Sequence, residues 1–150
     1  MIPPEFEYHR PETIDQALVL LTQHGDEAKI LAGGHSLLPL MKLRFAEPAH
    51  LVDLNFIESL RGIKESNGLI EIAAMTTESQ LITSPLLLEK CPLIPDAASQ
   101  IADPQVRNRG TIGGDIVHAD PGNDHPGFFC NPWQRWRTHC SGKRFFPGRV

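Results

Sequence analysis

Two pairs of consecutive glycines, Gly33-Gly34 and Gly113-Gly114, restrict the fold of this 150-residue chain more than any other feature. Glycine accepts backbone angles that other residues avoid, and it lets a neighbouring backbone or a ligand approach closely. Each pair also has a hydroxyl residue two positions away. Backbone amides and hydroxyls that converge at such turns bind anions, although either pair alone is also typical of a plain tight turn. Residues 32–36 are named the first glycine segment, and residues 111–115 the second.

The residues around the first glycine segment predict a small α/β lobe. An amphipathic helix over residues 13–24 begins at a capping box and is stopped by Gly25. A short apolar strand over 29–32 leads into the glycines, and a capped helix over 36–42 follows them. A second strand over 50–54 completes a strand-helix-strand unit, which requires a parallel pair of strands.

The chain beyond residue 55 is expected to form an antiparallel lobe. Apolar runs at 60–65 and 69–74 flank Asn67-Gly68, a dipeptide suited to a two-residue hairpin turn. Residues 103–124 are rich in Gly, Asp, Asn and Pro and are predicted to be a loop, where functional sites are common. Three short helices are predicted between hairpin and loop, over residues 77–82, from residue 84 onward and over residues 92–101.

Composition and charge exclude several classes of protein. No apolar run approaches the roughly 20 residues of a membrane-spanning helix, and the N-terminus lacks an export signal, so we expect a cytoplasmic protein. The three cysteines are an odd number without a CxxC pair, and His118, Asp120 and His125 form no clear ligand spacing, so no metal site is assigned. The net charge is −4 although the last 20 residues carry five basic and no acidic residues, so the body is strongly acidic and is not expected to bind nucleic acid.

The two glycine segments together predict a shared anion site, because a diphosphate has enough oxygens to need donors from two sides. Two unrelated loops are the alternative. Neither segment matches the G-x-G-x-x-G of a Rossmann fold, and no Lys-Ser/Thr follows as in a P-loop. Ser36 either caps the following helix or donates its hydroxyl to a phosphate. Arg107 and Arg109 are candidates to neutralise phosphate, but solvated surface arginines are more common.

Six motifs follow one another along the chain. They are Phe6-Glu7-Tyr8-His9-Arg10-Pro11, the run from Ala32 to Lys42, Leu51-Val52-Asp53-Leu54, Ala74-Met75-Thr76-Thr77, the run from Ile101 to Arg107, and Gly110-Thr111-Ile112-Gly113-Gly114. Through these motifs, in this order, residues 1–126 resemble the FAD-binding medium subunits of molybdenum hydroxylases. This family includes the medium chain of carbon monoxide dehydrogenase and the flavin segment of xanthine dehydrogenase.

The resemblance implies an α+β, PCMH-type (vanillyl-alcohol-oxidase-like) fold that holds FAD non-covalently between two lobes. Residues 1–54 would form the N-terminal α/β lobe, and residues 55–126 an incomplete second lobe. Covalent attachment to His35 is the alternative that some relatives of the broader fold suggest. The residues that the resemblance assigns to FAD are Ala32, Gly33, Gly34, His35 and Ser36, then Thr111, Ile112, Gly113, Gly114 and Asp115, and finally Asp124.

The same resemblance implies two partners, a large molybdopterin subunit and a small subunit with [2Fe-2S] clusters. Electrons would pass from the molybdenum-pterin centre through the clusters to FAD and then to an acceptor. No side chain of this chain is expected to act as an acid or base, because the cofactor carries out the redox chemistry.

Two features depart from the family. Asp115 stands where the family has Asn, so its carboxylate is expected to oppose the diphosphate. Residues 127–150 lack helical or strand periodicity and contain both tryptophans of the chain, which suggests an aberrant or disordered tail after a reading-frame slip. A basic aromatic segment for nucleic acid or an anionic membrane is the other interpretation. An inactive truncated fragment without flavin is therefore the alternative function.

Overall fold

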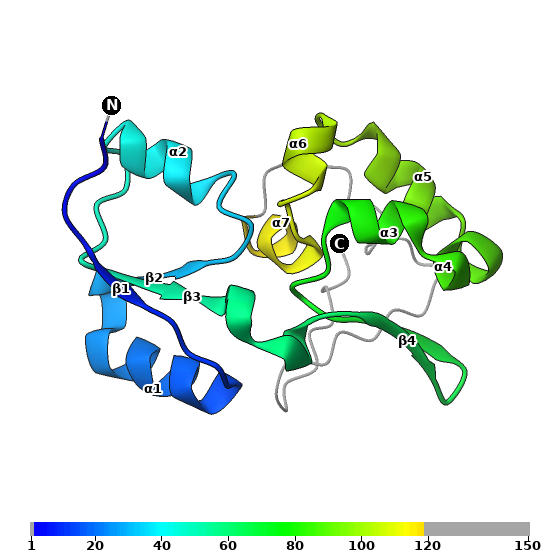
Figure 1. Ribbon diagram of the computed structural model, residues 1–150, viewed down its shortest axis with the longest axis horizontal. Helices are drawn as coiled ribbons and strands as arrows, with labels where there is room; N and C mark the ends of the chain where they lie inside the picture. The colour runs from blue at the N-terminus through cyan, green and yellow to red at the C-terminus, as the bar shows by residue number, and fades with distance from the viewer. Residues whose placement is uncertain (1, 119–150) are drawn as a thin grey trace, which may run out of the picture.

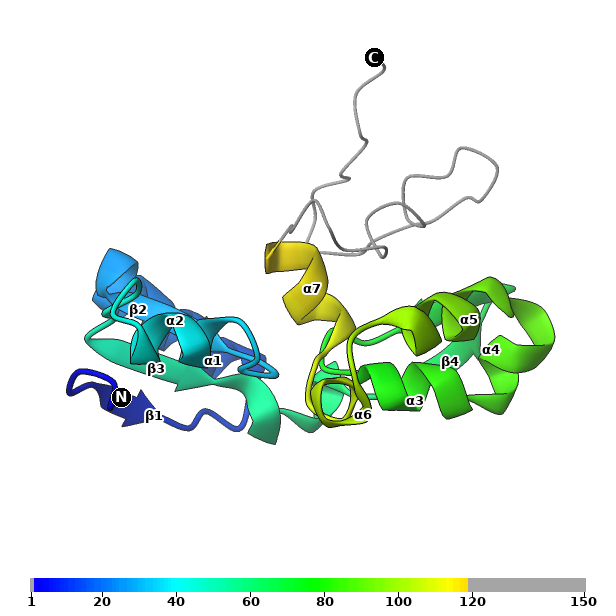
Figure 2. The same ribbon diagram turned by 90° about the horizontal axis from the view of Figure 1, so that it is seen from above.

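The computed structural model describes residues 2–118, so the predictions for Asp124 and for residues 127–150 lie outside the described residues. Two lobes lie side by side, and helix α7 (Ile112–His118) lies between them in both views (Figure 1 and Figure 2). Helices occur together with a three-stranded and a two-stranded sheet, which confirms the predicted α+β class.

The first lobe is built on a parallel sheet with strand order β1-β3-β2. The predicted parallel pair is β2 (Ala28–Leu31) with β3 (His50–Asp53). Strand β1 (Glu7–His9) adds a third parallel strand that the sequence did not predict, because three residues are too few to show a period of two. Helices α1 (Ile14–His24) and α2 (Leu37–Lys42) lie on opposite sides of this sheet (Figure 1).

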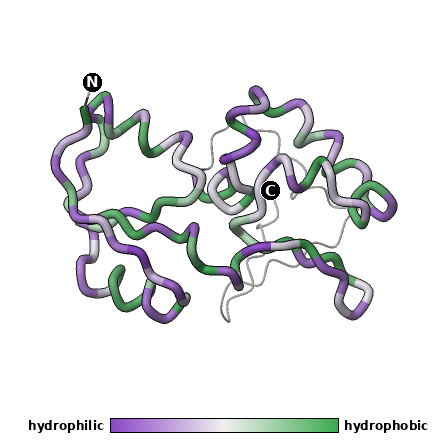
Figure 3. The backbone as a smooth tube through the Cα atoms, in the orientation of Figure 1, coloured by the Kyte–Doolittle hydropathy of each residue, from purple (hydrophilic) through white to green (hydrophobic). Residues whose placement is uncertain are grey.

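Helix α1 begins and ends as predicted, but only half of its capping box forms. The Thr13 hydroxyl accepts a hydrogen bond from the Gln16 amide, whereas the Gln16 side chain accepts one from the Glu12 amide instead of the Thr13 amide. Gly25 ends the helix with φ of 50°, and its amide donates to the Leu21 carbonyl. Polar and apolar residues alternate along α1 in Figure 3, and the apolar face packs on a core of Ala17, Ala28, Val52 and Ile57.

The second lobe opens with the predicted hairpin, β4 (Ile63–Ser66) and β5 (Leu69–Ile72), which pair antiparallel. Asn67 and Gly68 both have positive φ, as a two-residue turn with matching twist requires. The three predicted helices follow as α3 (Glu78–Thr83), α4 (Pro85–Lys90) and α5 (Leu93–Gln100). A second core joins hairpin, helices and α7 through Leu81, Leu87, Ile94, Ala98 and Ile112.

The predicted loop over 103–124 is wrong for two parts of the described chain. Helix α6 (Pro104–Arg107) forms because Asp103 accepts hydrogen bonds from the amides of Gln105 and Val106, and because proline is tolerated at the first helical position. Helix α7 takes in the second glycine pair. Polar composition therefore marked a helix cap at Asp103, and the second glycine pair lies in the first turn of α7.

Three 3-10 turns complete the described elements, and two of them carry the chain from one lobe to the other. Ile57 and Leu60 pack with the first core, whereas Ile63 packs with the second. The division of the chain near residue 55 stays a prediction. Within residues 2–118, no helix is both long and apolar enough to span a bilayer. The 3-10 turns are η1 (Gly25–Glu27), η2 (Leu54–Phe56) and η3 (Glu58–Leu60).

Candidate functional site

The first glycine segment leaves the end of β2 and turns into α2. Gly34 has φ of 81°, a backbone conformation that residues with side chains rarely adopt. A side chain at Gly33 would overlap the carbonyl oxygen of Arg109, in the other lobe. Gly33 therefore lets the two lobes approach each other closely.

The backbone amides of this segment form an unused set of donors. Among the described residues, none of the amides at positions 33–36 donates a hydrogen bond. The Ser36 hydroxyl does not cap α2 either, so the helix cap predicted for it does not form. His35 and Ser36 are exposed. Four successive amides and one hydroxyl are thus available to an anion.

The second glycine segment is hydrogen-bonded quite differently. Ile112 and Gly113 donate their amides to the carbonyls of Thr76 and Ala74, at 3.0 Å and 2.9 Å. The amides of residues 114 and 115 are also used, because they donate to the side chain and the carbonyl of Thr111. The segment is therefore bonded to the second lobe. Because its amides are already used, it would contact a ligand through its surface shape and side chains more than through amide hydrogen bonds.

Glycine at position 113 serves packing within the second lobe. A Cβ atom there would lie 2.7 Å from the Ala74 carbonyl oxygen, closer than real Cβ atoms come. A Cβ atom on Gly114 would lie 2.9 Å from the Thr111 hydroxyl and 3.7 Å from the Ala32 side chain of the first lobe. The two glycine segments thus adjoin each other, and a shared anion site between them stays a prediction.

A hydrogen-bond network that was not predicted from the sequence fixes the start of the first glycine segment. The buried Asp53 carboxylate accepts bonds from the Tyr8 hydroxyl at 2.6 Å and from the Asn55 side-chain amide at 2.7 Å. The same Asn55 amide group donates to the Ala32 carbonyl at 2.8 Å, which fixes the start of the segment. The bond to Asp53, followed by burial, raises the pKa of Tyr8. An aspartate and an asparagine two residues apart at a strand end are the signal that indicates such a turn.

Arg107, one of the two arginines considered as phosphate ligands, is bonded to the backbone instead. Arg107 donates from one guanidinium nitrogen to the carbonyls of Ser99, Ile101 and Ala102, at the end of α5. Ala102 has a positive φ of 42°, so this side chain stabilises a strained helix end.

Comparison with known proteins decides the family. Residues 4–130 match the family described as the FAD binding domain in molybdopterin dehydrogenase. The chain belongs to this family. The carbon monoxide dehydrogenase medium chain of Hydrogenophaga pseudoflava is 62% identical over 126 residues, which are 84% of this chain and 44% of that protein. The medium chain from Afipia carboxidovorans is 53% identical over the same shares of the two chains.

Solved structures agree with the family and confirm the expected FAD-binding fold. Carbon monoxide dehydrogenase from Hydrogenophaga pseudoflava, in a form that lacks the Mo-pyranopterin moiety, matches with a TM-score of 0.84 and 61% identity over 86% of this chain and 45% of that one. Quinoline 2-oxidoreductase from Pseudomonas putida 86 matches the same shares with a TM-score of 0.82 and 36% identity. This chain spans less than half the length of these relatives.

The residues of this FAD-binding domain fit the diphosphate of the cofactor. The unused amides at 33–36 and the uncapped Ser36 hydroxyl supply donors, and the glycine at position 34 has no side chain to cover them. Thr111 is buried and its hydroxyl accepts the Gly114 amide, so it shapes the adjoining wall. Asp115 is half-buried in the first turn of α7.

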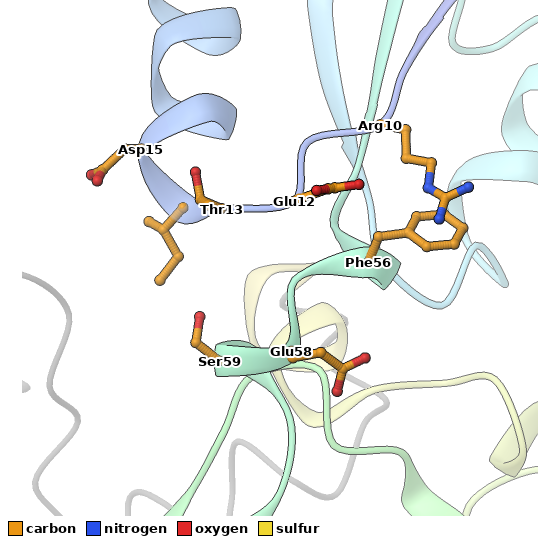
Figure 4. A pocket seen from close by; sticks show the side chains of 8 residues that line it. Arg10, Glu12, Thr13, Asp15, Phe56, Glu58 and Ser59 are labelled. Atoms are coloured by element: carbon orange, nitrogen blue, oxygen red, sulfur yellow. The ribbon is translucent and has the colours of Figure 1, made fainter.

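A hollow of about 810 Å³ lies away from the glycine segments, between the start of α1 and the 3-10 turns after β3 (Figure 4). Arg10 lies over the ring of Phe56, with 3.5 Å between the guanidinium carbon and the ring centroid. No residue of either glycine segment lines this hollow. Its lining consists of Arg10, Glu12, Thr13, Ile14, Asp15, Phe56, Glu58 and Ser59.

Proposed function

We propose that this chain binds FAD non-covalently as the flavin-binding part of a molybdenum hydroxylase, an oxidoreductase complex of the cytoplasm. The complex would also contain a large molybdopterin subunit and a small iron–sulfur subunit. The flavin would receive electrons from the iron–sulfur subunit and pass them to an acceptor. Support comes from the family match and from the medium-chain relatives. When bound, FAD supplies the electron-transfer chemistry, so the task of the chain is to hold and orient the cofactor.

The observation that carries the proposal is the row of unused amides at residues 33–36 where the two lobes meet. Gly33 and Gly34 are half-buried, and half-buried amides normally find a partner, so these two amides without one among the described residues indicate a place for an anion. The first segment would hold the diphosphate through these amides and the Ser36 hydroxyl. The second segment would close the other side, with Gly114 next to Ala32 of the first lobe and its amide bonded to the Thr111 hydroxyl.

The proposed assignment covers the same residues that the sequence indicated. Ala32, Gly33, Gly34, His35 and Ser36 would contact the diphosphate directly, and Thr111, Ile112, Gly113, Gly114 and Asp115 would shape the opposite wall. Asp124 keeps its proposed contact with the flavin nucleotide, outside the described residues. No side chain is assigned to acid or base catalysis.

Titration of the purified chain with FAD and with riboflavin tests the function. Riboflavin has the same ring system but no diphosphate, so we expect FAD to bind and riboflavin to bind at least about 100-fold more weakly, since two or more charge-assisted hydrogen bonds are missing. Equal affinities would show that the glycine segments do not hold the diphosphate. Failure of both ligands to bind would favour the alternative, a chain that does not hold flavin.

A further inference from the structure

Three histidines from three separate elements meet on one face of the first lobe's sheet. His9 ends β1, His24 ends α1, and His50 begins β3. In the register of the sheet, Ala28 at the start of β2 pairs with His50, whereas the end of β2, which leads into the first glycine segment, pairs with Asp53. This histidine cluster is therefore separate from the proposed flavin site.

The register of the sheet explains why these side chains share one face. Glu7 of β1 is the parallel partner of His50, and side chains alternate along a strand, so Glu7 and His9 project to the same side. Val52, two residues after His50, belongs to the core that α1 covers. The cluster thus lies on the α1 side of the sheet, where the last residue of α1 reaches it.

The ring nitrogens are already close to the spacing of metal ligands. His9 Nε2 lies 3.1 Å from His50 Nδ1, and Glu7 Oε2 lies 3.3 Å from the same His50 atom. Two ligands bound to one zinc ion at about 2.0–2.1 Å and a tetrahedral angle lie roughly 3.3 Å apart. One ligand atom from each of His9, His24 and His50 lies within 4.8 Å of the others, so rotation of the His24 ring out of its stack on His50 would complete the set.

The side chains are also held in place without a metal. The ring of His24 stacks on that of His50 with 3.7 Å between centroids, and the ring of His9 lies 5.2 Å and 5.3 Å from the other two. All three residues are half-buried.

We propose that His9, His24 and His50 bind a divalent transition-metal ion of the zinc type, with the Glu7 carboxylate as fourth ligand. Imidazole and carboxylate ligands suit zinc, nickel and copper, whereas magnesium and calcium prefer all-oxygen sites. With four protein ligands the site would be closed and structural, and it would tie α1 to β1 and β3. No redox or bond-making step is attributed to it.

Zinc titration of the full chain, free of its purification tag, tests the site. We expect one zinc ion per chain, and the His24→Asn variant is expected to lose more than the 10–100-fold in affinity that removal of an outer-shell partner typically causes. Asparagine is tolerated at a helix end, and circular dichroism checks that the variant folds. The matched control is His118→Asn, an exposed histidine at the end of α7 outside the cluster, which should bind zinc as the parent chain does.

Cobalt(II) in the unmutated chain gives a second measurement that does not depend on a variant's folding. A histidine–carboxylate site is expected to shift the ring-proton NMR signals of His9, His24 and His50 and to lack thiolate charge-transfer bands. Thiolate bands would place the metal on cysteines and overturn the proposal. Unchanged zinc affinity in His24→Asn, or no zinc binding by the folded parent chain, would overturn it as well.

Discussion

Ser36 and Ser84 occupy the same position before two short helices but use their hydroxyls differently. Ser84 accepts a hydrogen bond from the Leu87 amide, whereas Ser36 makes no capping bond. We predict that Ser36→Ala weakens FAD binding roughly tenfold, since a hydrogen bond to a charged group contributes about 1.5 kcal/mol or more, and leaves the stability of the FAD-free chain unchanged. FAD fluorescence titration and urea unfolding measure the two quantities.

Ser84→Ala is the matched control for that experiment. It removes a cap whose loss typically costs about 0.5–2 kcal/mol of stability, and Ser84 lies outside both glycine segments, so FAD affinity should not change. The opposite pattern, with Ser36→Ala destabilising and FAD affinity intact, would assign Ser36 to the helix and not to the ligand.

Asp115 is the residue of the proposed site whose charge is expected to oppose the diphosphate. We predict that Asp115→Asn tightens FAD binding about fivefold, because a like charge near the diphosphate contributes on the order of 1 kcal/mol of repulsion even when solvent screens it. Isothermal titration calorimetry measures the change, with the exposed Asp96→Asn in α5 as a control for net charge. Unchanged or weaker binding would mean that the Asp115 side chain faces away from the diphosphate.

Among the elements, the two glycine segments depend on close backbone approach for different reasons. Gly33 faces the Arg109 carbonyl across the lobes, and Gly113 faces the Ala74 carbonyl within one lobe. We predict that Gly33→Val and Gly113→Val both abolish FAD retention, because a branched side chain forces these backbones apart. Only Gly113→Val is also expected to lower the melting temperature of the second lobe strongly. FAD titration and thermal unfolding test both variants, and parent-like FAD affinity in Gly113→Val contradicts this account.

The strands β1 and β3 are joined by the bond from Tyr8 to Asp53, and this bond has a defined pH dependence. The bond raises the pKa of Tyr8 above its ordinary value of 10.0, so the bond's contribution is complete below about pH 10 and is lost as the pH rises through the higher folded-state pKa. Tyr8 is 49% exposed, which limits the contribution to about 1 kcal/mol or less. We predict that Tyr8→Phe is less stable than the parent at pH 8 and that the difference shrinks above pH 10 in urea unfolding.

Elements with local signals were predictable, and elements fixed by distant contacts were not. Helix α1 and the Asn67-Gly68 hairpin carry their caps and turn residues within a few positions of one another. Strand β1 owes its existence to β3, which lies more than 40 residues away in the chain. The bonds from the Ile112 and Gly113 amides run to Thr76 and Ala74, so no pattern within residues 111–115 indicates them. The histidine cluster was missed for the same reason.

At the scale of the whole molecule, two lobes, each with its own buried core, meet at a narrow junction. Leu81, Leu87 and Ile94 belong to the second core, and Ala17 and Val52 to the first, with no shared member among the described residues. The described contacts between the lobes include Gly33 against Arg109 and Ala32 beside Gly114. A ligand that binds both glycine segments therefore adds contacts where the protein itself has few.

This arrangement leads us to predict that FAD joins the two lobes into one unfolding unit. Without FAD, hydrogen exchange of β3 and of α5 should report different opening free energies, because each lobe opens around its own core. At about 100 times its dissociation constant, FAD should raise both by a similar amount, near 2.7 kcal/mol, since opening either lobe then releases the ligand. Riboflavin, which lacks the diphosphate, and FAD added to Gly33→Val serve as controls and should raise neither. Increased protection of only one lobe upon FAD binding would mean that the cofactor is held by that lobe alone, and a diphosphate site shared between the two glycine segments would be wrong.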